Sequence, residues 1–155
     1  MAVLLSYRKA TDEDLPFLLE LRIQTMSEHL TNAGIELNAK QQCEKVKEFY
    51  YDTQIILLNN KRVGTLKLAN FSTSLHIRQF QISPKIQGKG IGSRVLQDVL
   101  KQASKLQLPV TLNVLLANPA KALYLRHGFI VKNENDFEYQ MVYPLKQSNP
   151  NASRI

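Results

Sequence analysis

A glycine-rich turn between a strand and a strongly amphipathic helix is the feature that most constrains this chain. Ser74–Ile82 reads as a strand, and from Gly90 to Leu106 the apolar side chains recur at helical spacing instead. Pro109 ends this helix, and the β-rich run Val110–Leu115 follows. Since strand–helix–strand connections are right-handed and join parallel strands, we predict a β-α-β unit from Leu75 to Leu115.

The turn carries three alternating glycines, Gly88, Gly90 and Gly92. Glycine lets the backbone approach a ligand and adopt positive φ. The first turn of a helix leaves amides unpaired at the positive end of the helix dipole. Lys85 and Lys89 are basic, and the sequence has no acid between positions 74 and 97. The turn therefore predicts a phosphate or pyrophosphate site.

Two other phosphate-binding patterns do not fit this turn. A P-loop requires G-x-x-x-x-G-K-[ST], whereas Lys89 is followed by Gly90. A dinucleotide fold requires G-x-G-x-x-G and an acid after the next strand, whereas Ala117 and Asn118 follow it here. A turn without a ligand is the remaining alternative. Three glycines would weaken regular structure by about 0.5–1 kcal/mol each, so we favour a turn that binds something.

The remaining segments predict a mixed α/β protein with the order β-α-α-β-β-β-α-β-α-β-β. On the first helix, Leu15, Leu18, Leu19, Arg22 and Met26 share one mostly apolar face. The other predicted elements are a strand Leu4–Lys9, a first helix capped by Thr11 or Asp12, a loop Thr31–Asn38, a helix Ala39–Tyr51, a hairpin of Gln54–Leu58 with Val63–Phe71, a short helix Ala120–His127, and a hairpin of Phe129–Lys132 with Phe137–Tyr143.

Composition limits the class of protein. The length of 155 residues suits a single domain, which we place at residues 1–145, with a polar C-terminal tail at 146–155. The net charge of +7 suggests an anionic partner. The lone cysteine, Cys43, cannot form an internal disulfide, which fits a reducing, cytoplasmic setting. We expect no signal peptide, no membrane span and no metal, because no suitable apolar run or ligand spacing is present.

Two sequence blocks resemble the GNAT superfamily of N-acetyltransferases. Gln87-x-x-Gly90-x-Gly92 is similar to its Q/R-x-x-G-x-G/A motif, and the preceding Phe80–Pro84 resembles its lead-in strand. Asn118–Phe129 is similar to its N-P-A-R-x-L-Y-x-x-x-G-F block. The resemblance implies a mixed, mostly antiparallel central sheet of about six to seven strands, flanked by about four helices. It also implies transfer of an acetyl group from the cosubstrate acetyl-CoA to a primary amine by direct attack in a ternary complex.

The resemblance also assigns cofactor-binding residues. Backbone groups of Gln81 and Ile82 would pair with the pantetheine arm. Asn118 would hydrogen-bond this arm, Lys121 would lie near the phosphates, and Tyr124 would lie beside the thioester sulfur. The turn amides would hold the pyrophosphate; they belong to Gln87, Gly88, Lys89, Gly90, Ile91, Gly92 and Ser93.

The chemistry requires an acid for the departing thiolate and a base for the amine. Tyr124, with an ordinary pKa of about 10, suits the acid. Many relatives have a glutamate on the strand before the turn, and this strand has none. His76, or a water held by Gln79, could serve as the base. His29, predicted to follow the first helix, and Tyr139 would border the acceptor site.

Two other functions remain open. One is a non-catalytic acyl-CoA-binding or sensing module on the same fold, since the strand carboxylate is missing. The other is a basic nucleic-acid-binding domain, which ranks last because Phe80, Phe129 and Phe137 lie in strand patterns typical of a core. The acceptor stays open between a small-molecule amine and a peptide amine. A homodimer is a hypothesis drawn from the family alone.

Overall fold

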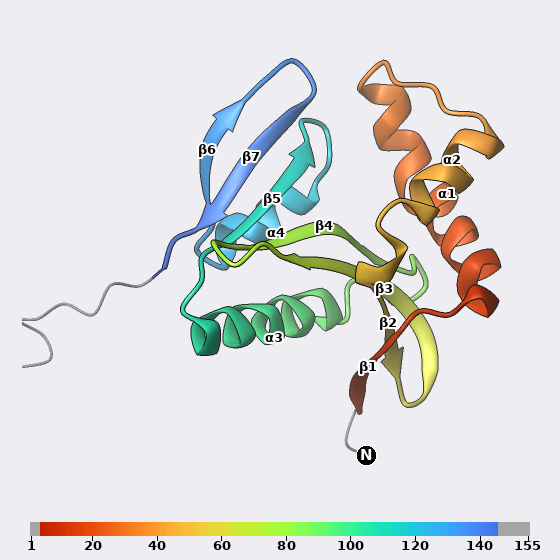
Figure 1. Cartoon of the computed structure of the whole chain (residues 1–155). Coiled ribbons are helices and arrows are strands. Elements are labelled where there is room, and N and C mark those ends of the chain that lie inside the picture. The colour runs from red at the N-terminus through yellow and green to blue at the C-terminus, as the bar shows by residue number, and fades with distance from the viewer. Residues whose placement is uncertain (1–3, 146–155) are drawn as a thin grey trace, which may run out of the picture.

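Seven strands form one sheet in the order β1-β2-β3-β4-β5-β7-β6 in the computed structural model, which describes residues 4–145 (Figure 1). All neighbouring pairs are antiparallel except β4 and β5. The strands are β1 (Leu5–Lys9), β2 (Thr53–Leu58), β3 (Lys61–Asn70), β4 (Leu75–Ile82), β5 (Val110–Leu115), β6 (Ile130–Glu134) and β7 (Glu138–Tyr143). The predicted fold class and the parallel β-α-β unit are confirmed.

Helices cover both faces of the sheet. They are α1 (Leu15–Asn32), α2 (Ala39–Lys47), α3 (Ile91–Leu106) and α4 (Ala120–Arg126), with short 3-10 turns at Asp12–Asp14 and Tyr50–Asp52. The sheet therefore has a hydrophobic core on each face, as two neighbouring residues of β2 show. Ile56 belongs to the large core that includes α3, whereas Ile55 packs with Leu18 of α1 and Val46 of α2. In Figure 1, α3 lies beneath the sheet, and α1 and α2 stand together at its other side.

Helix α1 is longer than the sequence predicted. It runs to Asn32, so His29 lies in its last turn and does not follow it. Capping also differs, because the 3-10 turn that Thr11 caps precedes the α-helix. Arg22 lies on the buried face beside Leu18 and Leu21, as the periodicity predicted. This position also makes Arg22 part of the lining of a cavity in the candidate active site.

Turn chemistry fixes the hairpin of β2 and β3. Asn59 and Asn60 both have positive φ, 51° and 67°. A two-residue loop with that geometry matches the right-handed twist of the flanking strands, and asparagine adopts it readily.

The predicted tail at residues 146–155 lies outside the described part of the chain, as do residues 1–3. The predicted domain limits therefore stay a prediction.

A buried carboxylate ties β1 and β3 to the start of α1. Asp14 is 1% exposed. Its oxygens accept hydrogen bonds from Arg8 at 2.7 and 2.9 Å, from Arg62 at 3.2 Å and from the amide of Thr11 at 2.8 Å. These donors hold the pKa of Asp14 well below its ordinary value, with the Arg8 hydrogen bonds as the largest cause and burial opposing them.

We expect Asp14→Asn to lower the free energy of unfolding by about 1–2 kcal/mol at neutral pH, because Arg8 and Arg62 are partly exposed and can turn to water. Because its folded-state pKa is depressed, the carboxylate stabilises the protein above the unfolded pKa of about 3.9. That stability is lost as the pH falls further. Urea unfolding measures the free energy of unfolding at both about pH 7 and about pH 3. The difference between the wild type and Asp14→Asn should be smaller at about pH 3. Asp136→Asn, at an exposed position, is the control, and equal losses in the two variants would contradict the prediction.

Candidate active site

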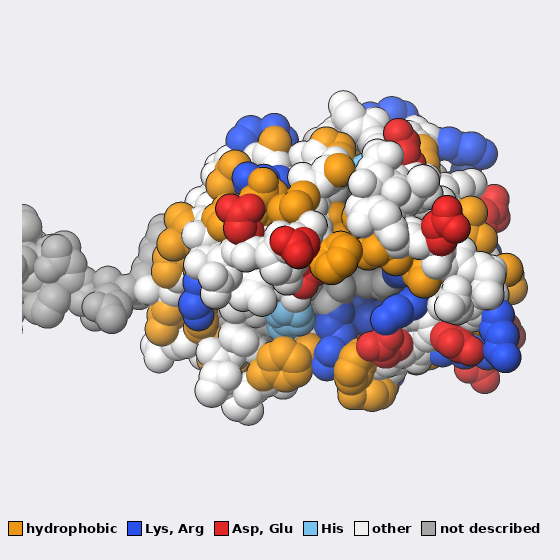
Figure 2. Space-filling model, turned by 90° about the horizontal axis from the view of Figure 1, so that it is seen from above, with side chains coloured by type: hydrophobic (Ala, Val, Ile, Leu, Met, Phe, Trp, Pro, Cys, Tyr) orange, Lys and Arg blue, Asp and Glu red, His pale blue; other side chains and the backbone are white. Residues whose placement is uncertain are grey.

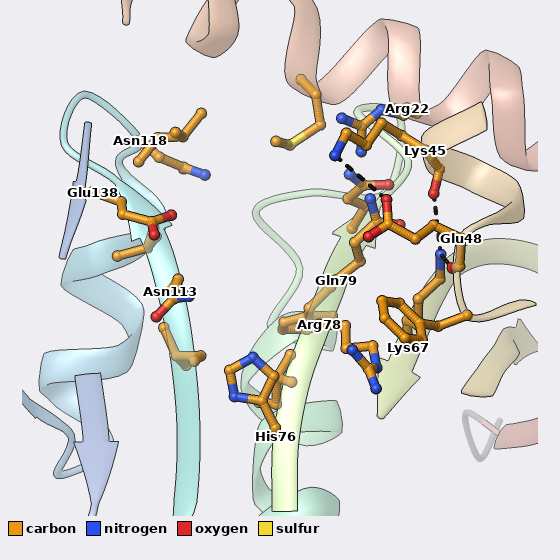
Figure 3. Close-up of a pocket in the computed structure, with 18 of the residues that line it drawn as sticks. Arg22, Lys45, Glu48, Lys67, His76, Arg78, Gln79, Asn113, Asn118 and Glu138 are labelled. Atoms are coloured by element: carbon orange, nitrogen blue, oxygen red, sulfur yellow. Dashed lines mark hydrogen bonds and ion pairs between the residues drawn. The ribbon is translucent and has the colours of Figure 1, made fainter. Parts of the chain in front are cut away.

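The sheet opens between its two parallel strands. Leu75–Ile77 of β4 pair with Val110–Leu112 of β5, and no later residues of the two strands pair with each other. Beyond this point β4 stays bonded to β3 and β5 stays bonded to β7. The facing edges of β4 and β5 therefore present main-chain groups to an open space, seen between the two strands in Figure 3.

Two cavities of about 390 Å³ each lie along this opening. We call the first the turn cavity, because the glycine turn and the start of α3 line it together with β4 and α4. The second is the basic cavity, which lies between β4, β5, α1 and the segment that follows α2. The two cavities share Met26, Phe80, Gln81, Asn118 and Tyr124. A ligand in one cavity would therefore meet a ligand in the other.

The glycine turn has free donors. Gly88 and Gly90 have φ of 80° and 79°, the left-handed region that glycine adopts without strain. Among the described residues, none accepts a hydrogen bond from the main-chain amides of residues 88–93. The side chain of Gln87 instead turns inward and donates to the carbonyl of Ile82 at 2.9 Å. The turn is thus built like an anion site at a helix start.

Most residues predicted to bind the cofactor line the turn cavity. Lys89 and Lys121 do not. The ammonium of Lys121 lies 3.7 Å from the ring centroid of Tyr139. Arg126, at the end of α4, lines the cavity although the sequence had not singled it out. The predicted residues that line the cavity are Gln81, Ile82, Gln87, Gly88, Gly90, Ile91, Gly92, Ser93, Asn118 and Tyr124.

Asn118 and Ser93 already have partners that orient them. The Oδ1 atom of Asn118 accepts from the amide of Ala120 at 2.9 Å, which leaves the amide nitrogen of the side chain as a donor. The hydroxyl of Ser93 lies 2.8 Å from Nε2 of His127. This contact joins the start of α3 to the end of α4, where His127 suits the negative end of the dipole.

Tyr124 lies where the cavities meet. It is 6% exposed, and its ring packs against Phe129 with centroids 5.6 Å apart. Burial raises the pKa of Tyr124 well above its ordinary value of 10. The phenol therefore stays protonated at neutral pH. None of the described residues forms a hydrogen bond with its hydroxyl, so the proton is available to a ligand.

The acceptor-side predictions divide between the cavities. His76 and Gln79 line the basic cavity, and His29 lines the turn cavity. Tyr139 lines neither. The Nδ1 atom of His76 lies 2.7 Å from Oγ1 of Thr111, and its ring stacks on Phe71. Burial and then the nearby Arg78 lower the pKa of His76, so the imidazole is neutral at pH 7.

The basic cavity also holds charged residues that the sequence analysis did not assign to a site. They are Arg22, Lys45, Glu48, Lys67, Arg78 and Glu138. Figure 3 shows Arg22, Lys45 and Glu48 converging on one side of the cavity, while Asn118 and Glu138 lie on the other. Arg22 was recognisable as a polar residue on an apolar helix face, whereas Glu138 gave no signal at the start of its strand.

The chain belongs to the GNAT acetyltransferases, because the family model described as an acetyltransferase (GNAT) domain matches residues 23–142. Members of the family use acetyl-CoA, which is therefore the cosubstrate of this chain. No curated protein sequence matches the chain significantly.

Solved structures share the fold at low sequence identity. An acetyltransferase from Thermus thermophilus has a TM-score of 0.72 at 22% identity, over 91% of this chain and 97% of its own. The PaiA N-acetyltransferase from Thermoplasma acidophilum, in complex with coenzyme A, has a TM-score of 0.68 at 18% identity, over 92% and 98%. The ribosomal-protein-S18-alanine N-acetyltransferase from Escherichia coli has a TM-score of 0.69 at 17% identity, over 96% of this chain and 98% of its own.

No helix within residues 4–145 is long and apolar enough to cross a membrane. In the same range, no three His, Cys, Asp or Glu side chains lie together so that they could hold a metal ion. The expectation of a metal-free reaction stays a prediction.

Proposed function

We propose that this chain transfers the acetyl group of acetyl-CoA to a primary amine by direct attack, with both substrates bound at once. The observation that carries the proposal is the meeting of the two cavities at Tyr124 and its four shared neighbours. A donor in the turn cavity and an acceptor in the basic cavity would then touch without a covalent enzyme intermediate. Bringing the reactants together supplies much of the rate enhancement.

The turn cavity fits the donor. Free amides at residues 88–93, at the positive end of α3, would hold the pyrophosphate. The unpaired edge of β4 at Gln81 and Ile82 would take the pantetheine arm as an added strand, with the side-chain amide of Asn118 as a further donor. Arg126 adds positive charge to the cavity wall, where Lys121 had been expected.

When bound, acetyl-CoA supplies an electrophilic carbonyl and a thiolate leaving group. Tyr124 would protonate that thiolate, since its hydroxyl is protonated at neutral pH and forms no hydrogen bond with any of the described residues. Neutral His76, or a water held by Gln79, would accept the proton of the amine. Glu138 offers a second route, because it supplies on β7 a carboxylate that β4 lacks.

The test is an acceptor screen with acetyl-CoA, with propionyl-CoA and succinyl-CoA beside it. We expect thiol release that depends on an added amine, and a product with the mass of the N-acetyl derivative. Reactions without acceptor measure background hydrolysis. Calorimetric binding of coenzyme A with no product from any amine would instead establish the non-catalytic module. An absence of binding up to millimolar concentration would overturn both functions.

A further inference from the structure

The basic cavity is lined by more cations than acids. Arg22, Lys45, Lys67 and Arg78 line it, against Glu48 and Glu138. Figure 2 shows Lys and Arg side chains gathered in a recess beside a histidine. A cavity lined in this way attracts anions and repels a purely cationic acceptor.

Two of these cations already have counterions. Arg78 donates to Asp52 through Nε at 3.0 Å, and its guanidinium lies 3.5 Å from the centroid of the Phe49 ring. Lys45 pairs with Glu48 at 3.4 Å, and both side chains are about half exposed. These two ion pairs do not neutralise the other two cations of the cavity, Arg22 and Lys67.

Lys67 is a buried cation with its donors occupied. It is 4% exposed, and its ammonium donates to the carbonyls of Lys45, Val46 and Glu48 at 3.4, 3.1 and 2.7 Å. It thereby caps the end of α2. No carboxylate among the described residues lies within ion-pair distance of it. Burial, followed by the charge of Arg22, lowers its pKa to about 8, so it is mostly charged at neutral pH.

Arg22 is buried as deeply, at 5% exposure, and its donors are mostly free. Its Nε donates to Oε1 of Gln42 at 2.6 Å. Within the described chain, the four N–H groups on its two terminal nitrogens have no hydrogen-bond partner, and no carboxylate forms an ion pair with them. Glu48 partly offsets the charge of Arg22 without forming an ion pair with it, whereas Lys67 repels it, so the free N–H groups of Arg22 favour an added anion.

We propose that the acceptor is a small amine that also carries a carboxylate or phosphate group, and that Arg22 binds this anion in the basic cavity. The planar guanidinium matches both groups through paired N–H donors. The charge of Lys67, which also lines the cavity, adds to the attraction for the anion, although its donors are used. The proposal rests on the amine acetyltransferase function and narrows it to anionic acceptors.

The decisive comparison uses acceptor pairs with the wild-type enzyme. Each amino acid is compared with its C-terminal amide, and O-phosphoethanolamine with ethanolamine. The amide of an amino acid has the less basic amine, so nucleophile availability alone favours the amide. We expect the anionic member of at least one pair to have a kcat/KM about 10- to 100-fold higher. The pair that responds distinguishes carboxylate from phosphate.

Variants then assign the effect to Arg22. Arg22→Gln should abolish the preference by lowering kcat/KM for the anionic member about 10- to 100-fold while changing the neutral member less than about threefold. Arg22→Lys should keep part of the preference, because it retains the charge without the fork. Lys105→Gln, an equal charge change on the exposed end of α3, should leave the preference intact.

If Arg22 had only a structural role, holding α2 through Gln42, Arg22→Gln would instead lower kcat/KM equally for both members of a pair. That result, or amides that react as well as acids with the wild type, would overturn the proposal while acetyl transfer stands. Circular dichroism and coenzyme A calorimetry establish that each variant is folded. If Arg22→Gln does not fold, the wild-type pairs decide. If no amine is acetylated, the proposed function fails, and calorimetry with the amino acids and O-phosphoethanolamine decides whether the cavity binds anions.

Discussion

Replacing Tyr124 by phenylalanine is expected to lower kcat about 100-fold and to leave the Kd for coenzyme A nearly unchanged. The substitution removes only the hydroxyl. Phenylalanine keeps the edge contact with Phe129, so the core around α4 should survive. Because the hydroxyl has no partner among the described residues, its loss leaves no protein group unsatisfied. The effect should therefore fall on the chemical step.

The matched control is Tyr143→Phe. Tyr143 also packs against Phe129, with centroids 5.6 Å apart, and lines neither cavity. Its variant should retain kcat within about threefold. Thiol release gives kcat, and calorimetry gives the Kd for coenzyme A. An unaltered kcat in folded Tyr124→Phe would remove the acid role and favour solvent as the proton source.

Replacing Gly90 by valine is expected to raise the Kd for coenzyme A about 5- to 30-fold. Gly90 has a φ of 79°, and a β-branched residue there is a clear outlier with a strain of about 1–2 kcal/mol. No heavy atom lies within 4 Å of a Cβ added at this position, so the protein has room for the side chain. The strain can be relieved only by turning the backbone, which would move the amides away from the pyrophosphate.

Gly34→Val is a close control for that variant. Gly34 has a φ of 76°, has equally open space around an added Cβ, and lines neither cavity. Both variants should lose similar thermal stability, but only Gly90→Val should lose affinity. Calorimetry and thermal unfolding separate the two effects. Equal affinities in the two variants would show that the turn amides do not hold the cofactor.

Local sequence patterns predicted the order of helices and strands, because each pattern spans only a few neighbouring residues. The helical spacing of Ile91, Val95, Val99 and Ala103 marked α3, and all four are buried. Two of the three glycines that marked the turn, Gly88 and Gly90, adopt the positive φ that only glycine takes without strain, whereas Gly92 lies in the first turn of α3. These signals need no knowledge of the rest of the chain.

The opening in the sheet could not be predicted in the same way. Leu75–Ile77 pair with β5 and Arg78–Ile82 do not, yet both halves of β4 have strand-like sequences. Lys67 lies within the buried stretch Val63–Ala69 of β3, and it is tolerated there because the carbonyls at the end of α2 receive its ammonium. Such residues depend on partners about 20 positions away, which periodicity does not reveal.

The three residue pairs that join β4 to β5 leave the middle of the sheet incomplete in the free chain. On our proposal, the pantetheine arm supplies the missing strand, so binding and folding are thermodynamically linked. A ligand present at about 100 times its Kd would add about 2.7 kcal/mol to the free energy of unfolding. A melting temperature of this protein therefore has meaning only together with the coenzyme A concentration at which it was recorded.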